Sequence, residues 1–395
     1  MFRDMDWLDE KRARIYCAAA AIALLGAFAQ MLLGLHHGYD AHGDLLGGDY
    51  SSFWAASRLI LLGRPADVYV PALHHLAELP VLRNSYSAFY YPPTYLVLCL
   101  PLALTAFFPS LLLFLGTTGA AFAAVLWRIL RAPWSFVAVL AFPAVYIDIM
   151  PGQNAFLTAA ILGCGLGLLG RRPGVAGAIL GLMVLKPHLA LAVPVALLVS
   201  RRWQTLICAA ASALGLVAIS YALFGWGTWA AFLANAHEAR ETLEQGTVGF
   251  DKMQSTFALA RLLGASVPAA YALHSLTALT AISALIWAQR QQTGAAAERA
   301  LIVIACLLIT PFSLFYDMVI LALPLAWMLC EWRLHGFPPW SKLLLCAVLL
   351  APAVHLFCGP GPFALPILLV FGAYILRRVP ITRNAPAFSW HGASA

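Results

Sequence analysis

The stretch "IYCAAAAIALLGAFAQMLLGL", residues 15–35, decides the fold class because it carries no charged residue along its whole length. A helix needs about 20 apolar residues to cross a bilayer, and comparable runs recur throughout this 395-residue chain. The composition is 62% hydrophobic and 10% charged, whereas soluble domains carry about 25% charged residues. We therefore predict an all-α polytopic membrane protein that forms a single integral-membrane domain over residues 1–395.

Further apolar runs predict a bundle of about 12 transmembrane helices. Beyond 15–35 they lie near 110–130, 134–150, 154–170, 174–200, 204–223, 268–288, 300–312, 317–331, 341–357 and 362–376. The run at 174–200 lies between Arg171/Arg172 and Arg201/Arg202, which a single span would place on opposite sides of the membrane. Basic clusters favour the cytoplasmic side, so we expect two short arms with Lys186 at the reversal.

Charge sets the predicted orientation. With both termini cytoplasmic, as tails 1–14 and 377–395, 17 of the 24 basic residues fall inside, whereas 11 of the 17 acidic residues fall outside. This asymmetry follows the positive-inside rule. Short basic clusters between apolar runs do not suggest a nucleic-acid partner, and they fit a bacterial inner membrane.

Two external segments are expected: 36–109, with short amphipathic and juxtamembrane helices, and 224–264. The first holds Asp49 in "GGDYSSFWAASRLILLG", residues 47–63. Asp49 fits an N-cap for the helical stripe that follows, and it also fits a general base at the membrane edge. The aromatic residues Phe53, Trp54 and Tyr95 fit an interfacial belt, or a surface on which a sugar stacks.

Other polar residues are candidates because an intramembrane charge costs about 2.5–3.5 kcal/mol and is usually functional. Lys186 is either an anion-binding cation or a lysine that reaches water from a helix turn. Asp317 opens an apolar span, where the helix dipole alone would stabilise it. Gln153 and Asn154 fit a cap for the next span as well as a cavity wall.

Neither the cysteines nor the histidines match a recognised metal-ligand spacing. The eight cysteines are scattered without a CxxC pair. We therefore expect no metal and no cofactor.

Six motifs in order resemble glycosyltransferase family 87, whose bacterial members were filed as domain of unknown function 2029. They are "GGDYSSFWAASRLILLGRPADVY", "YYPPTYLVLCLPLAL", "MPGQNAFLTAAILG", "GLMVLKPHLALAVP", "FDKMQSTFALARLLG" and "TPFSLFYDMVILALP", between about residues 45 and 330. The mannosyltransferase members resemble "SP-x-SW-x-HH" near the last motif. At the corresponding positions this chain has Pro311, Ser313, Leu314, Tyr316 and Asp317. The resemblance therefore does not identify the sugar that is transferred.

The resemblance implies a GT-C bundle that moves a hexose, often mannose, from a polyprenyl-phosphate donor to a lipid or glycan hydroxyl. It implies Asp49 as catalytic base in an inverting, metal-independent reaction at the outer face. Candidates for the leaving phosphate are Lys186, His188 and Lys252. The expected substrate cavity is formed by Tyr50, Trp54, Tyr91, Gln153, Asn154, Tyr316 and Asp317.

A polytopic transporter, or a lipid or glycan flippase, is the main alternative. Transporters often contain helices broken near the membrane midplane, as 174–200 is expected to be, but this chain has no convincing internal repeat. A non-catalytic membrane scaffold is a third possibility, and it leaves Lys186 unexplained.

Overall fold

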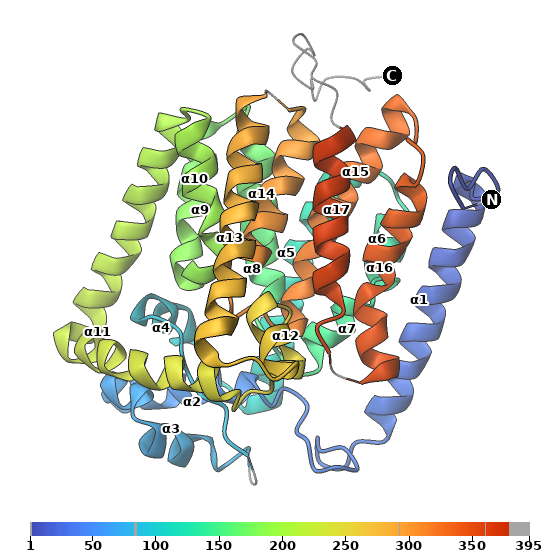
Figure 1. Ribbon diagram of the computed structural model, residues 1–395. Helices are drawn as coiled ribbons and strands as arrows, with labels where there is room; N and C mark the ends of the chain where they lie inside the picture. Colours follow the sequence, from blue (N-terminus) through green and yellow to red (C-terminus); the bar gives the residue numbers. More distant parts are fainter. Residues whose placement is uncertain (1, 83–84, 292, 360, 379–395) are drawn as a thin grey trace.

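The computed structural model describes residues 2–82, 85–291, 293–359 and 361–378, and within them it contains helices and no β-strand (Figure 1). Five helical segments of this described part are long and apolar enough to cross a membrane. They are α1 (Glu10–Leu33), α5 (Phe107–Leu130), α11 (Trp203–Gln245), α13 (Val267–Arg290), and 3-10 helix η6 (Phe315–Leu321) continued by α15 (Ala322–His335).

Shorter helices complete the bundle. They are α6 (Ser135–Leu140), α7 (Pro143–Ile149), α8 (Ala155–Leu168), α9 (Pro173–Gly181), α10 (Ala192–Val199), α14 (Ala295–Ile309), α16 (Ser341–Cys358) and α17 (Ala364–Arg378). The predicted single span 134–150 is wrong in one respect: it is divided into α6 and α7, because Pro143 begins a new helix there. The predicted count of about 12 crossings stays a prediction.

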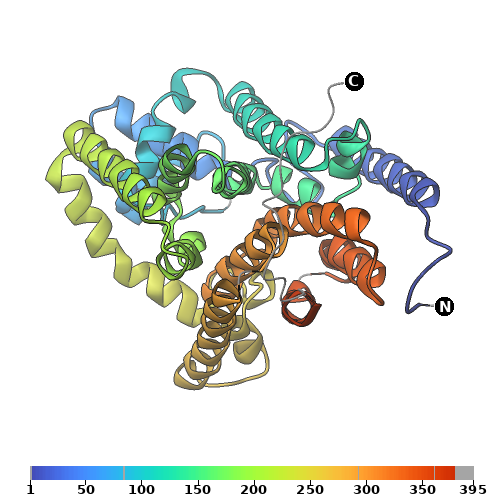
Figure 2. The ribbon, with the colours of Figure 1, turned by 90° about the horizontal axis from the view of Figure 1, so that it is seen from above.

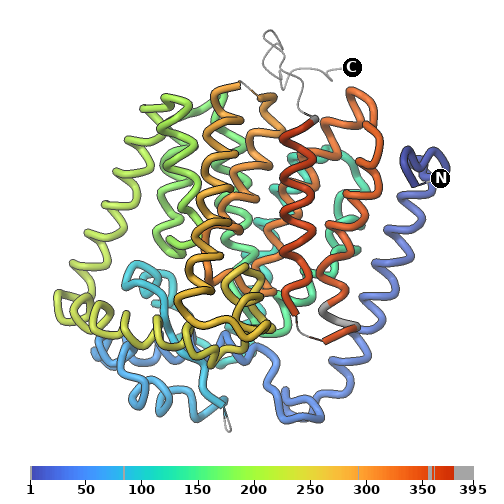
Figure 3. Tube along the Cα trace, in the orientation of Figure 1, coloured from blue at the N-terminus to red at the C-terminus, as the bar shows by residue number. Residues whose placement is uncertain are grey.

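The bundle has two different ends. In Figures 1 and 3, α1 begins and α17 ends at the upper end. The lower end is covered by α2 (Tyr50–Leu61), α3 (Pro71–Glu78), the second half of α11, and α12 (Thr256–Leu262). Between α2 and α5 the chain also forms η1 (Pro65–Tyr69), α4 (Pro93–Cys99) and η2 (Leu102–Leu104). The predicted tail beyond Arg378 lies outside the described residues.

The chain reverses at Lys186, as the basic clusters predicted. Two 3-10 turns flank it, η3 (Leu182–Leu185) and η4 (Pro187–Ala190), and Pro187 has no backbone N–H with which to continue a helix. The start of α11 packs closely against α9, because a Cβ added to Gly177 would lie only 2.2 Å from the carbonyl oxygen of Thr205. Both arms of the hairpin therefore begin and end at the same end of the bundle.

Helix α11 turns sharply at Gly225, whose φ of 74° and ψ of 172° are not helical. Its first half follows the bundle, and its second half runs across the lower end (Figure 1). There the Tyr69 and Phe232 rings lie 5.5 Å apart, and the Tyr90 hydroxyl is 2.8 Å from that of Thr242. The predicted external segment 224–264 is thus largely helical, and within it the 3-10 helix η5 (Phe250–Lys252) follows α11.

An aromatic core fixes the first loop to the bundle. Phe53 is fully buried, and its ring lies 5.0 Å from that of Tyr95 and 5.3 Å from that of Tyr91. Because Phe53 and Tyr95 are buried among protein side chains, the predicted interfacial belt is wrong for these two residues.

Two glycine turns bring Asp49 to the start of α8. Gly47 and Gly152 have φ values of 79° and 73°, which favour glycine. The Gly47 N–H donates to the Met150 carbonyl at 2.8 Å, and the Tyr50 N–H donates to the Pro151 carbonyl at 3.0 Å. A Cβ on Gly152 would lie 2.7 Å from the Tyr50 Cβ, so only glycine allows the two turns to approach this closely.

We expect Gly152→Ala to lower the melting temperature and the free energy of unfolding, by roughly 1–3 kcal/mol, because the added methyl overpacks this contact. Gly63→Ala is the matched control: Gly63 has a similar φ of 74° but nothing within 4 Å of its Cβ position. Thermal melts of both variants in one detergent measure the difference. Equal losses would show that backbone conformation alone, and not the close approach, requires glycine at position 152.

Candidate active site

The Asp49 side chain does not cap the helix that follows it. Asp49 occupies the N-cap position of α2, yet its carboxylate makes no capping hydrogen bond to that helix. It accepts instead from Gln153 Nε2 at 3.0 Å. The predicted capping role is therefore wrong, and the half-buried carboxylate is directed toward the turn before α8.

Gln153 joins Asp49 to the tyrosines of the first loop. Its Oε1 accepts from the Tyr91 hydroxyl at 3.1 Å. The Tyr91 and Tyr95 rings stack at 4.4 Å, and the Tyr95 hydroxyl accepts from Asn154 Nδ2 at 3.1 Å. Gln153 and Asn154 are adjacent in the chain, and the side chain of each forms a hydrogen bond with a tyrosine of the first loop. Neither side chain caps α8.

Lys186 is buried, with 4% of its surface exposed, and is paired. Its ammonium donates to Asp317 Oδ1 at 2.7 Å and to Asn154 Oδ1 at 3.0 Å. It also lies 5.2 Å from the centre of the Tyr316 ring. Because the ammonium bonds to buried partners, the alternative of a lysine that reaches water is wrong.

Asp317 has two functions in the packing. Its Oδ2 accepts from the Leu314 N–H at 3.1 Å, which caps η6, while its Oδ1 binds Lys186. The helix-terminus role expected from the sequence is confirmed, and the ion pair is an addition to it. A connected polar network therefore extends from Asp49 through Gln153 and Asn154 to Lys186 and Asp317.

Four of the predicted site residues lie outside this network. The buried Tyr50 hydroxyl is 2.6 Å from that of Ser110. The Trp54 indole donates to the Thr105 carbonyl at 3.1 Å. The buried His188 Nε2 has no hydrogen-bond partner among the described residues. Lys252 is exposed on η5, near enough for its charge to act on Asp49.

Sequence reasoning missed Asp148 at the end of α7. Asp148 is fully buried, and its carboxylate accepts from the N–H groups of Ala155 at 3.3 Å and Phe156 at 3.2 Å. It therefore caps α8, the role that the sequence analysis considered for Gln153 and Asn154. An acidic residue at the end of the apolar run 134–150, just before "MPGQN", was the available signal.

Another buried acid, Glu78 on α3, lies near Asp49. It accepts from the Ser51 hydroxyl at 2.8 Å and from the Ser87 N–H at 3.2 Å, and its carboxylate lies 3.9 Å from His74 Nε2. Burial raises the pKa of Glu78 to about 8 and lowers the pKa of His74 to about 3. Both shifts favour the neutral forms of these side chains, so the contact between Glu78 and His74 is polar packing and not an ion pair.

The electrostatics of Asp49 suit a base. Removal from bulk water raises the pKa of its carboxyl above the ordinary value, while the Gln153 hydrogen bond and the charges of Lys252 and Lys186 oppose this rise. A carboxylate with a raised pKa accepts a proton more readily.

The described residues include no group of three or more His, Cys, Asp and Glu side chains that could hold a metal ion.

Comparison with known families gives one match. The model for glycosyltransferase family 87 matches residues 89–311, which is more than half of the chain. The chain belongs to glycosyltransferase family 87. No curated protein and no solved structure matches it.

The family 87 match divides the network. It includes Gln153, Asn154 and Lys186, whereas Asp49 and Asp317 lie outside residues 89–311. The family therefore supports a membrane glycosyltransferase, and the roles of Asp49 and Asp317 depend on the geometry described above.

We expect a double-mutant cycle to reveal strong coupling between Lys186 and Asp317. Lys186→Met or Asp317→Asn alone leaves a buried charge uncompensated and should cost about 3–5 kcal/mol of unfolding free energy. The double variant removes both charges, and its Asn can still accept from the Leu314 N–H, so it should regain at least half of that loss. Equilibrium unfolding of purified protein tests this. Simple addition of the two single losses would contradict the pairing.

We also expect stability to depend on pH through Glu78. Its pKa is raised from about 4.5 to about 8 in the folded protein. The stabilising contribution is therefore complete below pH 4.5 and is lost as pH rises through about 8, because the unfolded state then releases the proton more readily. Below about pH 6.5 the lowered pKa of His74 contributes with the opposite sign. Thermal melts between about pH 6.5 and 8 should therefore show a decline that Glu78→Gln reduces and the exposed-site control Glu241→Gln does not. An unchanged decline in Glu78→Gln would rule out Glu78 as its source.

Proposed function

We propose that this membrane glycosyltransferase transfers a hexose, such as mannose, from a polyprenyl-phosphate donor to a hydroxyl of a lipid or glycan. The observation that carries the proposal is the Asp49 carboxylate, which is held by Gln153 at 3.0 Å instead of capping α2. An acid in this position costs the fold a capping bond. Such a cost is understandable if the carboxylate is needed as a base.

In the proposed reaction Asp49 removes the proton from the acceptor hydroxyl as that oxygen attacks the anomeric carbon. A new carbon–oxygen bond forms on one face of the sugar, and the bond to the phosphate breaks on the other. Polyprenyl phosphate leaves with the bonding electrons, and the anomeric configuration inverts. The proton on Asp49 is subsequently released to water.

Among the three cations expected to stabilise the leaving phosphate, we favour Lys252. It is exposed, and its charge acts on Asp49. Two of the three ammonium donors of Lys186 are already used by Asp317 and Asn154. In this proposal Lys186 orients Asn154 and its neighbour Gln153, and the phosphate is met chiefly by Lys252.

The end of the bundle that carries α2 and α3 would face the exterior of a bacterial inner membrane, with both termini cytoplasmic. Arg333 pairs with Glu10 at the first residue of α1, and α1 begins at the opposite end of the bundle, as the positive-inside rule favours for the cytoplasm. A lipid donor could then approach from the outer leaflet.

We expect Asp49→Asn to lower sugar transfer by about 10²–10⁴-fold, because general-base catalysis contributes on that order. Asp44→Asn is the control, since Asp44 lies exposed in the same loop. The assay uses purified protein, polyprenyl-phosphate mannose with a panel of other lipid-linked sugars, and membrane lipids as acceptors. Wild-type activity should fall as pH drops through the raised pKa of Asp49.

Equal transfer by wild type and Asp49→Asn would exclude Asp49 as the base. Donor binding without transfer by either protein would mean that the acceptor was absent from the assay, whereas a lack of donor binding would favour a transporter or flippase.

A further inference from the structure

A cavity of about 370 Å³ lies between α1 and the rest of the bundle, and it shares no residue with the network from Asp49 to Asp317. It follows the first turns of α1, from Glu10 to Cys17, at the end of the bundle where α1 begins. Its volume lies within the range of roughly 300–1,000 Å³ that is usual for small-molecule sites.

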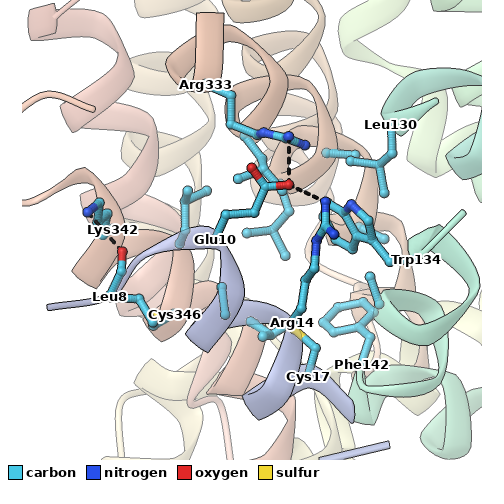
Figure 4. A pocket seen from close by; sticks show the side chains of 18 of the residues that line it. Leu8, Glu10, Arg14, Cys17, Leu130, Trp134, Phe142, Arg333, Lys342 and Cys346 are labelled. Atoms are coloured by element: carbon cyan, nitrogen blue, oxygen red, sulfur yellow. Dashed lines mark hydrogen bonds and ion pairs between the residues drawn. The ribbon is translucent and has the colours of Figure 1, made fainter. Parts of the chain in front are cut away.

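The walls of this cavity are almost entirely apolar (Figure 4). The lining includes Leu126 and Leu130 of α5, Phe142, Leu325 and Leu329 of α15, and Leu345 of α16. Apolar walls give a water molecule too few hydrogen-bond partners, so water is a poor occupant. In a membrane the apolar chain closest to this cavity is the acyl chain of a lipid.

Helix α1 stands at the edge of the bundle (Figure 2). Ala21 is its only buried residue among those described, and Ile15 and Ile22 are 53% and 72% exposed. Contacts with the bundle include Glu10 with Arg333 at 3.0 Å and Phe28 with Tyr146 at 5.5 Å. A helix attached in this way leaves room for an acyl chain beside it.

The charged rim of the cavity favours an anion. Arg14 and Arg333 share the single carboxylate of Glu10, and both guanidinium groups lie near the Trp134 ring, at 6.0 and 5.9 Å (Figure 4). Lys342 also lines the cavity and donates to the Leu8 carbonyl at 2.9 Å. The only other acid of the lining, Asp9, is used to cap α1. Three basic groups therefore face two acidic ones.

An unpaired donor lies at the same place. The Trp134 indole nitrogen is buried and has no hydrogen-bond partner in the described part of the chain. A buried N–H without a partner is costly, and a phosphate or ester oxygen would satisfy it. This observation is independent of the charges and of the cavity volume.

We propose that the cavity binds an anionic phospholipid from the leaflet at the end where α1 begins. One acyl chain lies between α1 and the walls formed by α5, α15 and α16. The phosphate lies at Arg14, Arg333 and the Trp134 indole. This site is distinct from that of the lipid-linked sugar donor, and it does not depend on the proposed reaction.

Native mass spectrometry of the full-length protein in detergent tests the site, with titration by phosphatidylglycerol, phosphatidylcholine and polyprenyl phosphate in parallel. We expect phosphatidylglycerol to be retained most strongly. Arg14→Gln and Arg333→Gln should each weaken it by about fivefold, the usual effect of one basic residue on an anionic lipid. Arg128→Gln is the control, because Arg128 is exposed at the end of α5 and outside the cavity.

Glu10→Gln provides a test of opposite sign. Without its carboxylate both guanidinium groups are released toward the phosphate, so retention of phosphatidylglycerol should increase while that of phosphatidylcholine stays unchanged. A decrease in phosphatidylglycerol retention would show that Glu10 and the arginines serve only to attach α1, and it would overturn the headgroup assignment.

Filling the cavity tests the acyl-chain position. Ala138→Phe places a ring in the cavity and should remove bound phospholipid, whereas Leu140→Phe, on the same helix but outside the cavity, should retain it. Equal retention by the two variants would overturn the proposal. Tighter retention of polyprenyl phosphate than of phosphatidylglycerol, sensitive to Ala138→Phe, would also overturn it by assigning the cavity to the donor lipid.

Discussion

The ammonium of Lys186 imposes the strongest physical constraint on this bundle. A charge at the bilayer centre costs about 2.5–3.5 kcal/mol, and Lys186 is 4% exposed among apolar helices. The cost is offset by Asp317 at 2.7 Å and Asn154 at 3.0 Å, which come from segments far apart in the chain. Pairing this one lysine therefore holds the reversal between α9 and α10 against the start of α8 and against η6.

The same pairing limits what Lys186 can do in a reaction. Both Asp317 oxygens are engaged, one by Lys186 and the other by the Leu314 N–H. Buried polar groups held by hydrogen bonds resist displacement, since a movement leaves one of them without a partner. Such rigidity suits a support for Asn154 and Gln153 better than a group that must bind and release a phosphate. The ammonium of the exposed Lys252 forms no hydrogen bond or ion pair with the described residues, which is why we favour it as the phosphate partner.

Hydropathy and basic clusters predicted the features that depend on one stretch of chain. These are the helical bundle, the reversal at Lys186 and the change of direction near residue 224. The pairing of Lys186 with Asp317, and of Asp49 with Gln153, could not be predicted, because a single sequence does not say which distant segments meet. The belt assigned to Phe53 and Tyr95 was wrong for the same reason: an aromatic residue at a membrane edge packs inward when neighbouring segments cover it.

Backbone contacts on either side of Asp49 control where this residue lies. Its position follows from the close approach of the Gly47 and Gly152 turns, joined by hydrogen bonds from Gly47 to Met150 and from Tyr50 to Pro151. These bonds fix the backbone on both sides of Asp49, and the hydrogen bond from Gln153 then orients the carboxylate. A misplacement of about 1 Å can lower catalysis by 10²-fold. Glycine at these two positions is therefore part of what places the proposed base, although neither glycine has a reactive group of its own.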